Sequence, residues 1–158
     1  MFPLDAVLSA AIGAIIGLLI ALPAIIIELR EKNGEHHDLP IIVDAKPFWE
    51  KSFTHRERVF TSVLIHVLGS ALFGFLYPVF AVDGWFFLTG HPYSLVSLLV
   101  YSVGAWLIAG LILFPLIGFG FFGTKEDDFV PFEILFMMLV LGVGLWLAVQ
   151  WFQPSFFV

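Results

Sequence analysis

Four apolar runs, each long enough to cross a membrane as a helix, dominate this sequence of 158 residues. A transmembrane helix needs roughly 20 consecutive apolar residues to span the hydrocarbon core of a bilayer. We expect helices over residues 3–29, 57–82, 92–117 and 129–152. Charged residues concentrate in segment 30–58 and in the group 125–128. The sequence therefore predicts an all-α, polytopic transmembrane four-helix bundle, forming a single domain over 1–158 with a cytoplasmic loop at 30–56.

The composition supports a membrane protein and excludes several classes of site. Only 13% of the residues are charged, whereas a soluble domain usually carries about 25%. The absence of cysteine excludes disulfides, thiolate metal sites and cysteine nucleophiles. A net charge of −6 without a basic tract argues against nucleic acid as a partner. No G-x-S-x-G motif is present, so the sequence carries no evident catalytic site.

The basic residues predict how the chain is oriented in the membrane. All seven lysines and arginines lie in segment 30–58 or at Lys125, and none lies near either terminus or in segment 83–91. Positive residues are retained on the cytoplasmic side of a membrane. We therefore expect both termini outside the cytoplasm. The bilayer would be a bacterial plasma membrane, with loops 30–56 and 118–128 on its inner side.

Three glycines near the end of the third expected helix have the G-x-G-x-x-G spacing of a dinucleotide-binding loop. They are Gly118, Gly120 and Gly123. Such a loop must follow a β-strand and begin a helix, but these glycines follow an apolar helix that contains Pro115. We interpret them as residues that let the third helix unwind and turn sharply into the fourth. No cofactor is expected on their account.

Small or hydroxyl side chains recur at about four-residue spacing on three of the expected helices. Such stripes allow helices to approach closely in lipid. The stripes are Ser9, Gly13, Gly17 and Ala21, then Ser62, His66, Ser70 and Gly74, and finally Ser97, Tyr101, Ala105 and Ala109. We expect these residues to face a shared interior, while the many phenylalanines and leucines face lipid.

Four ionisable residues form a candidate buried polar site. His66 lies on one of these stripes, and Arg58 precedes it on the same helix. Glu28 follows Gly17, and Glu133 precedes Gly144, by about three helical turns in each case. Both carboxylates are thus expected on the packed side, near the cytoplasmic surface. An ionisable group inside a membrane points to function, so these four residues are the candidates.

A structural role for the same residues is the main alternative. The two glutamates lie near helix ends, where they could be hydrated or pair with Arg58, Arg56 or Lys125. His66 could bond to Ser62, to Ser70 or to a backbone carbonyl. A metal or haem centred on His66 is a further alternative, but the other four histidines (His36, His37, His55 and His91) fall in loops or at helix ends.

Two stretches resemble a known group of proteins. They are HVLGSALFGFLY, residues 66–77, and PLIGFGFFG, residues 115–123. Together they are similar to small bacterial four-helix inner-membrane proteins that are classified only as a domain of unknown function. The resemblance covers roughly residues 58–150. It implies a histidine in the last helix, which this chain lacks, and it assigns no role beyond the position of His66.

Three functions remain open from the sequence. The first is a membrane protein without a catalytic site that acts through helix packing, as an accessory subunit or as a homo-oligomer. The second is a small proton or cation transporter or channel that uses Glu28, Glu133 and His66. We find no ionisable residue in the outer half to continue such a path. The third is a metal- or haem-binding membrane protein centred on His66.

Overall fold

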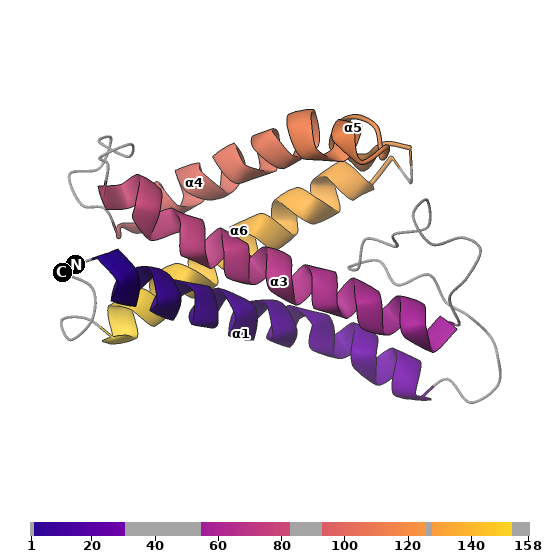
Figure 1. Cartoon of the computed structure of the whole chain (residues 1–158), viewed down its shortest axis with the longest axis horizontal. Coiled ribbons are helices and arrows are strands. Elements are labelled where there is room, and N and C mark those ends of the chain that lie inside the picture. Colours follow the sequence, from indigo (N-terminus) through magenta and orange to yellow (C-terminus); the bar gives the residue numbers. More distant parts are fainter. Residues whose placement is uncertain (1, 31–54, 83–92, 126–127, 153–158) are drawn as a thin grey trace.

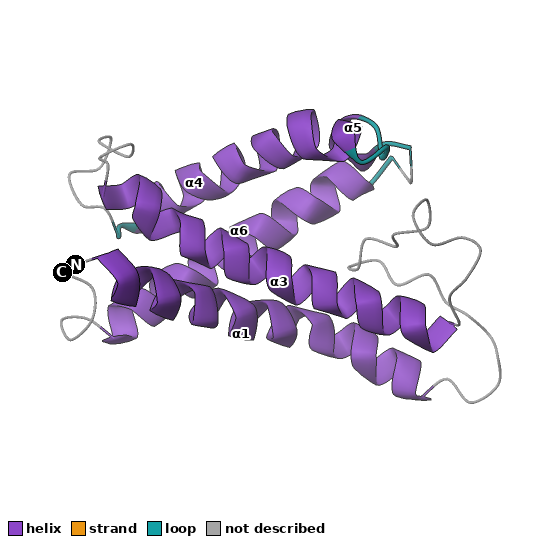
Figure 2. Cartoon of the chain, viewed as in Figure 1, coloured by secondary structure: helices purple, strands orange, loops and turns teal. Residues whose placement is uncertain are grey.

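A computed structural model describes residues 2–30, 55–82, 93–125 and 128–152. These residues form helices and turns and contain no strand (Figure 2). Four helical segments within them are long and apolar enough to cross a membrane: Asp5–Pro23, Val59–Phe80, Leu95–Leu116 and Val130–Phe152. Within the described residues, the predicted all-α fold with four helices long and apolar enough to span a membrane is confirmed. The predicted loop 30–56 lies outside the described residues except at its two ends.

The long helices form two antiparallel hairpins (Figure 1). The first hairpin pairs α1 (Phe2–Arg30) with α3 (His55–Val82), and the second pairs α4 (Leu95–Ile108) with α6 (Val130–Phe152). The start of α1 and the end of α6 lie together, at what we call the terminal end. The opposite end holds the turn 117–125, and we call it the loop end. The hairpins meet at the terminal end and diverge toward the loop end.

Glycines bring the backbones of α1 and α3 into direct contact. A Cβ atom at Gly13 would overlap the carbonyl oxygen of Ser70, and one at Gly74 would overlap the carbonyl oxygen of Ser9. Gly17 lies in the same interface, against the hydroxyl of Ser70. Contacts this close are available only to residues without a side chain. The prediction that these two stripes face the interior is confirmed.

A glycine also faces a serine in the second hairpin. A Cβ atom at Gly142 on α6 would overlap the hydroxyl of Ser102 on α4. The Ser102 hydroxyl donates to the Leu98 carbonyl at 2.8 Å, just as that of Ser70 donates to the His66 carbonyl at 2.8 Å. Each serine therefore satisfies its hydroxyl within its own helix. It can then pack against a glycine without leaving a polar group unpaired.

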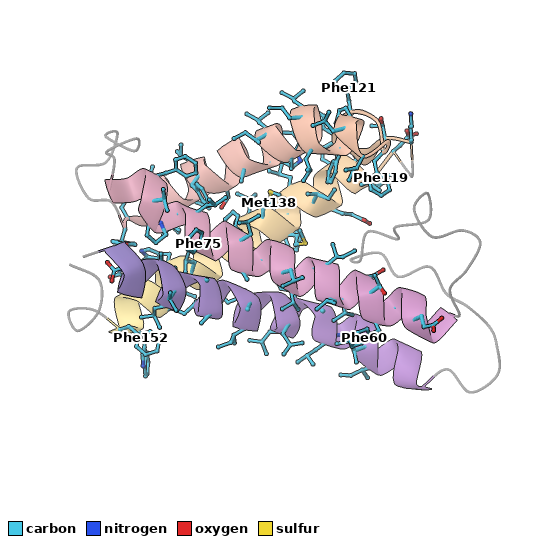
Figure 3. All side chains as sticks on the ribbon, viewed as in Figure 1. Phe60, Phe75, Phe119, Phe121, Met138 and Phe152 are labelled. Atoms are coloured by element: carbon cyan, nitrogen blue, oxygen red, sulfur yellow. The ribbon has the colours of Figure 1, made fainter. Side chains whose placement is uncertain are left out.

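The apolar core lies where all four helices meet, toward the terminal end. Its buried residues are Ile12, Phe73, Tyr77, Tyr93, Leu98, Tyr101, Leu141, Leu145 and Val149. Many large apolar side chains elsewhere are exposed, and Phe121 and Phe152 project away from the helices (Figure 3). This distribution confirms that small and hydroxyl residues pack inside and that many phenylalanines and leucines face outward, but Phe73, Leu98, Leu141 and Leu145 are buried and correct the expectation for those positions.

The third spanning helix differs from the prediction at both ends. It begins at Leu95 and not at Pro92, because Ser94 caps it by accepting a hydrogen bond from the Ser97 N–H at 3.1 Å. It also changes to a π-helical turn, η2 (Ala109–Leu113), before the short α5 (Phe114–Leu116). Within this turn the N–H of Phe114 donates to the Ala109 carbonyl. Pro115 has no N–H to donate, which favours such a local rearrangement.

The three glycines of the G-x-G-x-x-G spacing form the turn between the second pair of helices. Gly118, Gly120 and Gly123 have φ angles of 93°, 77° and 80°, which side chains other than glycine rarely adopt. A 3-10 turn, η3 (Phe121–Gly123), lies within this segment. Helices, and no strand, flank the glycines. The interpretation that they unwind the third helix and turn the chain toward α6 is confirmed.

An aromatic contact holds this turn against the second hairpin. Phe122 has a φ of 54°, and its ring packs on Gly110 in the π-helical turn. The ring also contacts Trp106, with 4.5 Å between the ring centroids. The Trp106 Nε1–H donates to the Pro131 carbonyl at the start of α6, at 2.9 Å. These contacts fix α4, the turn and α6 to one another.

Candidate functional site

His66 lies in the interface between α1 and α3. Its imidazole forms a hydrogen bond with the backbone of Gly17. Its Nε2 atom is buried and has no hydrogen-bond partner. The neighbouring hydroxyl of Ser70 donates to the backbone carbonyl of His66 and not to the ring. The imidazole is therefore part of the helix contact, with one ring nitrogen left unpaired.

The other three predicted site residues are not brought to His66 by the atoms that the structure describes. Glu133 is exposed in the first turn of α6, which belongs to the other hairpin. Glu28 lies on α1 and Arg58 on α3, but their side chains lie outside the described atoms. The end of α1 and the start of α6 lie apart in Figure 1. A shared site of His66 with the glutamates stays a prediction.

No group of metal ligands surrounds His66 within the described part of the chain. Among those residues, no three side chains of histidine, aspartate or glutamate lie close enough together to hold a metal ion. The hypothesis of a metal or haem at His66 therefore gains no support from them.

A second polar region, which the sequence analysis missed, lies at the terminal end. All three tyrosines of the chain gather there with serines and one aspartate. We call it the terminal cluster, and its members are Asp5, Tyr77, Tyr93, Ser94, Ser97 and Tyr101. It joins α1, α3 and α4, and Tyr77 is fully buried within it.

Hydroxyl groups connect the members of the terminal cluster. The Ser94 hydroxyl donates to that of Ser97 at 3.0 Å, and Ser97 is hydrogen-bonded to the hydroxyl of Tyr77. The Tyr77 ring lies 5.6 Å from that of Tyr93 and 5.1 Å from that of Tyr101, between centroids. The Tyr101 hydroxyl donates to the Phe73 carbonyl on α3 at 2.7 Å. The cluster is thus both aromatic and polar.

Asp5 contributes the negative charge of the terminal cluster. Burial and, to a smaller degree, the nearby negative charge of Asp5 raise the pKa of Tyr93 to about 12. Tyr93 therefore keeps its proton at neutral pH and can donate a hydrogen bond. The carboxylate of α1 and the phenol that precedes α4 lie close enough to interact.

The terminal cluster corrects one expectation from the sequence. We found no ionisable residue in the half of the bundle that holds the termini, but Asp5 and the buried tyrosines lie there. One signal was available, because Tyr93, Ser97 and Tyr101 recur every four residues and so share a helix face. The contribution of Asp5 and Tyr77 depends on how α1 and α3 pack, which that spacing does not reveal.

No protein-family model, curated protein or solved structure matches this chain. The resemblance to bacterial four-helix inner-membrane proteins therefore rests on the motifs at 66–77 and 115–123.

Proposed function

We propose that this protein is an integral membrane protein without a catalytic site that acts through helix packing, as an accessory subunit or as a homo-oligomer. One stripe of α3 carries the proposal. Tyr77 and Phe73, toward the terminal end, are only 0% and 7% exposed. Gly69 and Ile65 extend the same row of residues four apart, a ridge that winds about 40° around the helix at each step. Ile65 is 50% exposed, and a Cβ atom at Gly69 would meet no atom within 4 Å.

The stripe loses its cover toward the loop end, where it winds around α3 and where the second hairpin diverges from the first (Figure 1). A face that is packed at one end and uncovered at the other can be completed by a helix of another chain. In lipid such helices associate through close packing, and a glycine such as Gly69 permits a close approach. This geometry suits a subunit in which the uncovered part of α3 contacts a partner helix, while the four helices remain packed against one another at the terminal end.

Photo-cross-linking in the native membrane tests this proposal. Because the chain lacks cysteine, Ile65→Cys can be labelled specifically with a benzophenone maleimide. Leu64→Cys is the matched control, since Leu64 is 46% exposed and adjacent but lies about 100° around the helix. We expect the Ile65 variant to form a cross-linked product and the Leu64 variant to form much less.

The mass of that product separates the two forms of the proposal. A product of twice the chain mass indicates a homo-oligomer, and a product containing another protein indicates an accessory subunit. If neither variant is cross-linked, and native mass spectrometry of the gently extracted protein shows only a bare monomer, the proposal is wrong.

We further propose that the protein lies in a bacterial plasma membrane with both termini outside the cytoplasm. Two features support this orientation. The start of α1 and the end of α6 share one end of the molecule. Every lysine and arginine lies in segment 30–58 or at Lys125, and the end of α1, the start of α3 and the turn 117–125 lie toward the other end. Reporter fusions at each terminus test it. We expect a periplasm-active reporter to work at both termini, and an active cytoplasmic reporter at either terminus would contradict the orientation.

A further inference from the structure

His66 places an ionisable ring inside the contact between α1 and α3. Its Nε2 atom is buried and has no hydrogen-bond partner. The two helices leave little room at this level, because a Cβ atom at Gly17 would overlap the Ser70 side chain and lie 3.7 Å from the His66 carbonyl oxygen. One turn along α1, Gly13 lies against the Ser70 carbonyl. A proton added at Nε2 would therefore create a charged N–H without an acceptor between closely packed helices.

The charged residues of the surrounding helices lie far from the level of His66. That level is at Gly17 on α1 and near Gly144 on α6, which packs against α1 there. Measured along their own helix axes, the nearest charged residues are roughly 12 Å or more away. They are Asp5 and Glu28 on α1, Glu57 and Arg58 on α3, and Glu133 on α6. On α4 the one ionisable side chain, Tyr101, donates its hydroxyl to the Phe73 carbonyl. Within the described part of the chain, no charged group faces His66 to balance a proton.

The two ends of the first hairpin are held differently. Toward the terminal end, Ile12, Phe73 and Tyr77 belong to the core where all four helices meet. Toward the loop end, the second hairpin diverges from the first (Figure 1). His66 lies seven residues, roughly 10 Å, inside the span that begins at Val59. Separation of α1 from α3 at the loop end would therefore bring interfacial water to His66 and leave the core intact.

We propose that His66 makes the first hairpin a pH-sensitive switch. With a neutral imidazole, α1 and α3 are in contact along the hairpin, which is the closed form. With a proton on the imidazole, they separate at the loop end, which is the open form. This switch goes beyond the proposed function, because it holds whether or not the protein has a partner.

The direction of the pH dependence follows from which form binds the proton. An imidazole in water takes up a proton near pH 6.5, about the value for an exposed histidine. The open form lets water reach His66 and binds this proton, whereas the closed form offers no acceptor for the added N–H. The closed form is therefore favoured above about pH 6.5. Below it, the ratio of open to closed form rises by up to about tenfold for each pH unit.

Distances between pairs of spin labels in lipid nanodiscs, measured at pH 8 and at pH 5, test the switch. Because the chain lacks cysteine, labels can be attached at introduced cysteines. Ile26→Cys with Phe60→Cys reports on the loop end, and Val7→Cys with Phe75→Cys reports on the terminal end. These four side chains are 45%, 70%, 60% and 41% exposed, so the labels point away from the contact. We expect a longer loop-end distance to appear at pH 5, while the terminal-end distance stays unchanged.

Histidine variants assign the effect. In His66→Gln, which is neutral at both pH values, the loop-end distance should be the same at pH 8 and pH 5, and His66→Leu repeats this test if the glutamine variant does not fold. Glutamine at the other four histidines (His36, His37, His55 and His91) should leave the opening in place. An unchanged loop-end distance in the labelled chain that retains His66 would overturn the proposal. So would an increase that persists without His66, or equal widening at both ends, which indicates general unfolding.

Discussion

Replacing Gly74 with leucine is expected to separate α1 from α3 and to lower the free energy of unfolding by about 3 kcal/mol or more. The reason is the position of the missing Cβ atom, which would overlap the backbone carbonyl of Ser9. A backbone carbonyl cannot move aside as the end of a flexible side chain can. The helices must therefore shift apart, and the packing of Gly13 against Ser70 one turn away is lost with them. Unfolding by denaturing detergent in mixed micelles measures the change.

Gly69→Leu is the matched control on the same helix. A Cβ atom at Gly69 would meet no atom within 4 Å, so leucine fits there without a clash. We expect the stability of the isolated chain to change by less than about 0.5 kcal/mol. Equal destabilisation by the two substitutions would contradict the backbone contact between α1 and α3. A loss of the Ile65 cross-link in Gly69→Leu, without loss of stability, would place a partner at that face.

Leu145→Ala is expected to lower the free energy of unfolding by about 2 kcal/mol or more, because it opens a cavity where the four helices meet. Leu145 is 1% exposed and belongs to the core with Leu98 and Leu141. In a membrane the leucine side chain has apolar surroundings in both the folded and the unfolded state, so the usual transfer from water contributes little. The cost comes instead from the dispersion contacts that the smaller side chain cannot make.

Leu147→Ala provides the comparison for this prediction. Leu147 is 56% exposed on the outer face of the same helix, and the substitution removes the same atoms. Since lipid replaces the lost contacts there, we expect a change below about 0.5 kcal/mol, measured by the same unfolding assay. Similar losses at the two positions would show that Leu145 is not packed in the core described here.

The helical segments were predictable from the sequence because few backbone conformations satisfy their own hydrogen bonds in an apolar solvent. Unpaired N–H and C=O groups are costly in lipid, so each apolar run must form its hydrogen bonds within itself. The stripe of Ser9, Gly13 and Gly17 was also predictable, because small residues at four-residue spacing share one helix face. The end of α3 at Val82 and the end of α6 at Phe152 agree with the expected bounds.

Local details of the third helix were harder to predict. Proline is favoured in the first turn of a helix, and serine is favoured as its N-cap, so the sequence allows a start at Pro92 or just after Ser94. The hydrogen bond from the Ser97 N–H to the Ser94 side chain identifies Ser94 as the cap. The sequence indicates a break near Pro115, but the π-helical turn also depends on Phe122, which packs on Gly110 from outside the helix. Such a contact between segments has no signature in a local pattern.

The sequence by itself determined the membrane setting, the four spans and the inward-facing stripes, because these follow from hydropathy and helical periodicity alone. The tertiary structure decided which helix faces pack against one another. It paired α1 with α3 and α4 with α6, and it placed His66 against Gly17 and Glu133 on the other hairpin. It also gathered Asp5, Tyr77 and Tyr93 into one cluster. Their proximity depends on helix crossing and on the divergence of the hairpins, which are set by contacts between residues far apart in the chain.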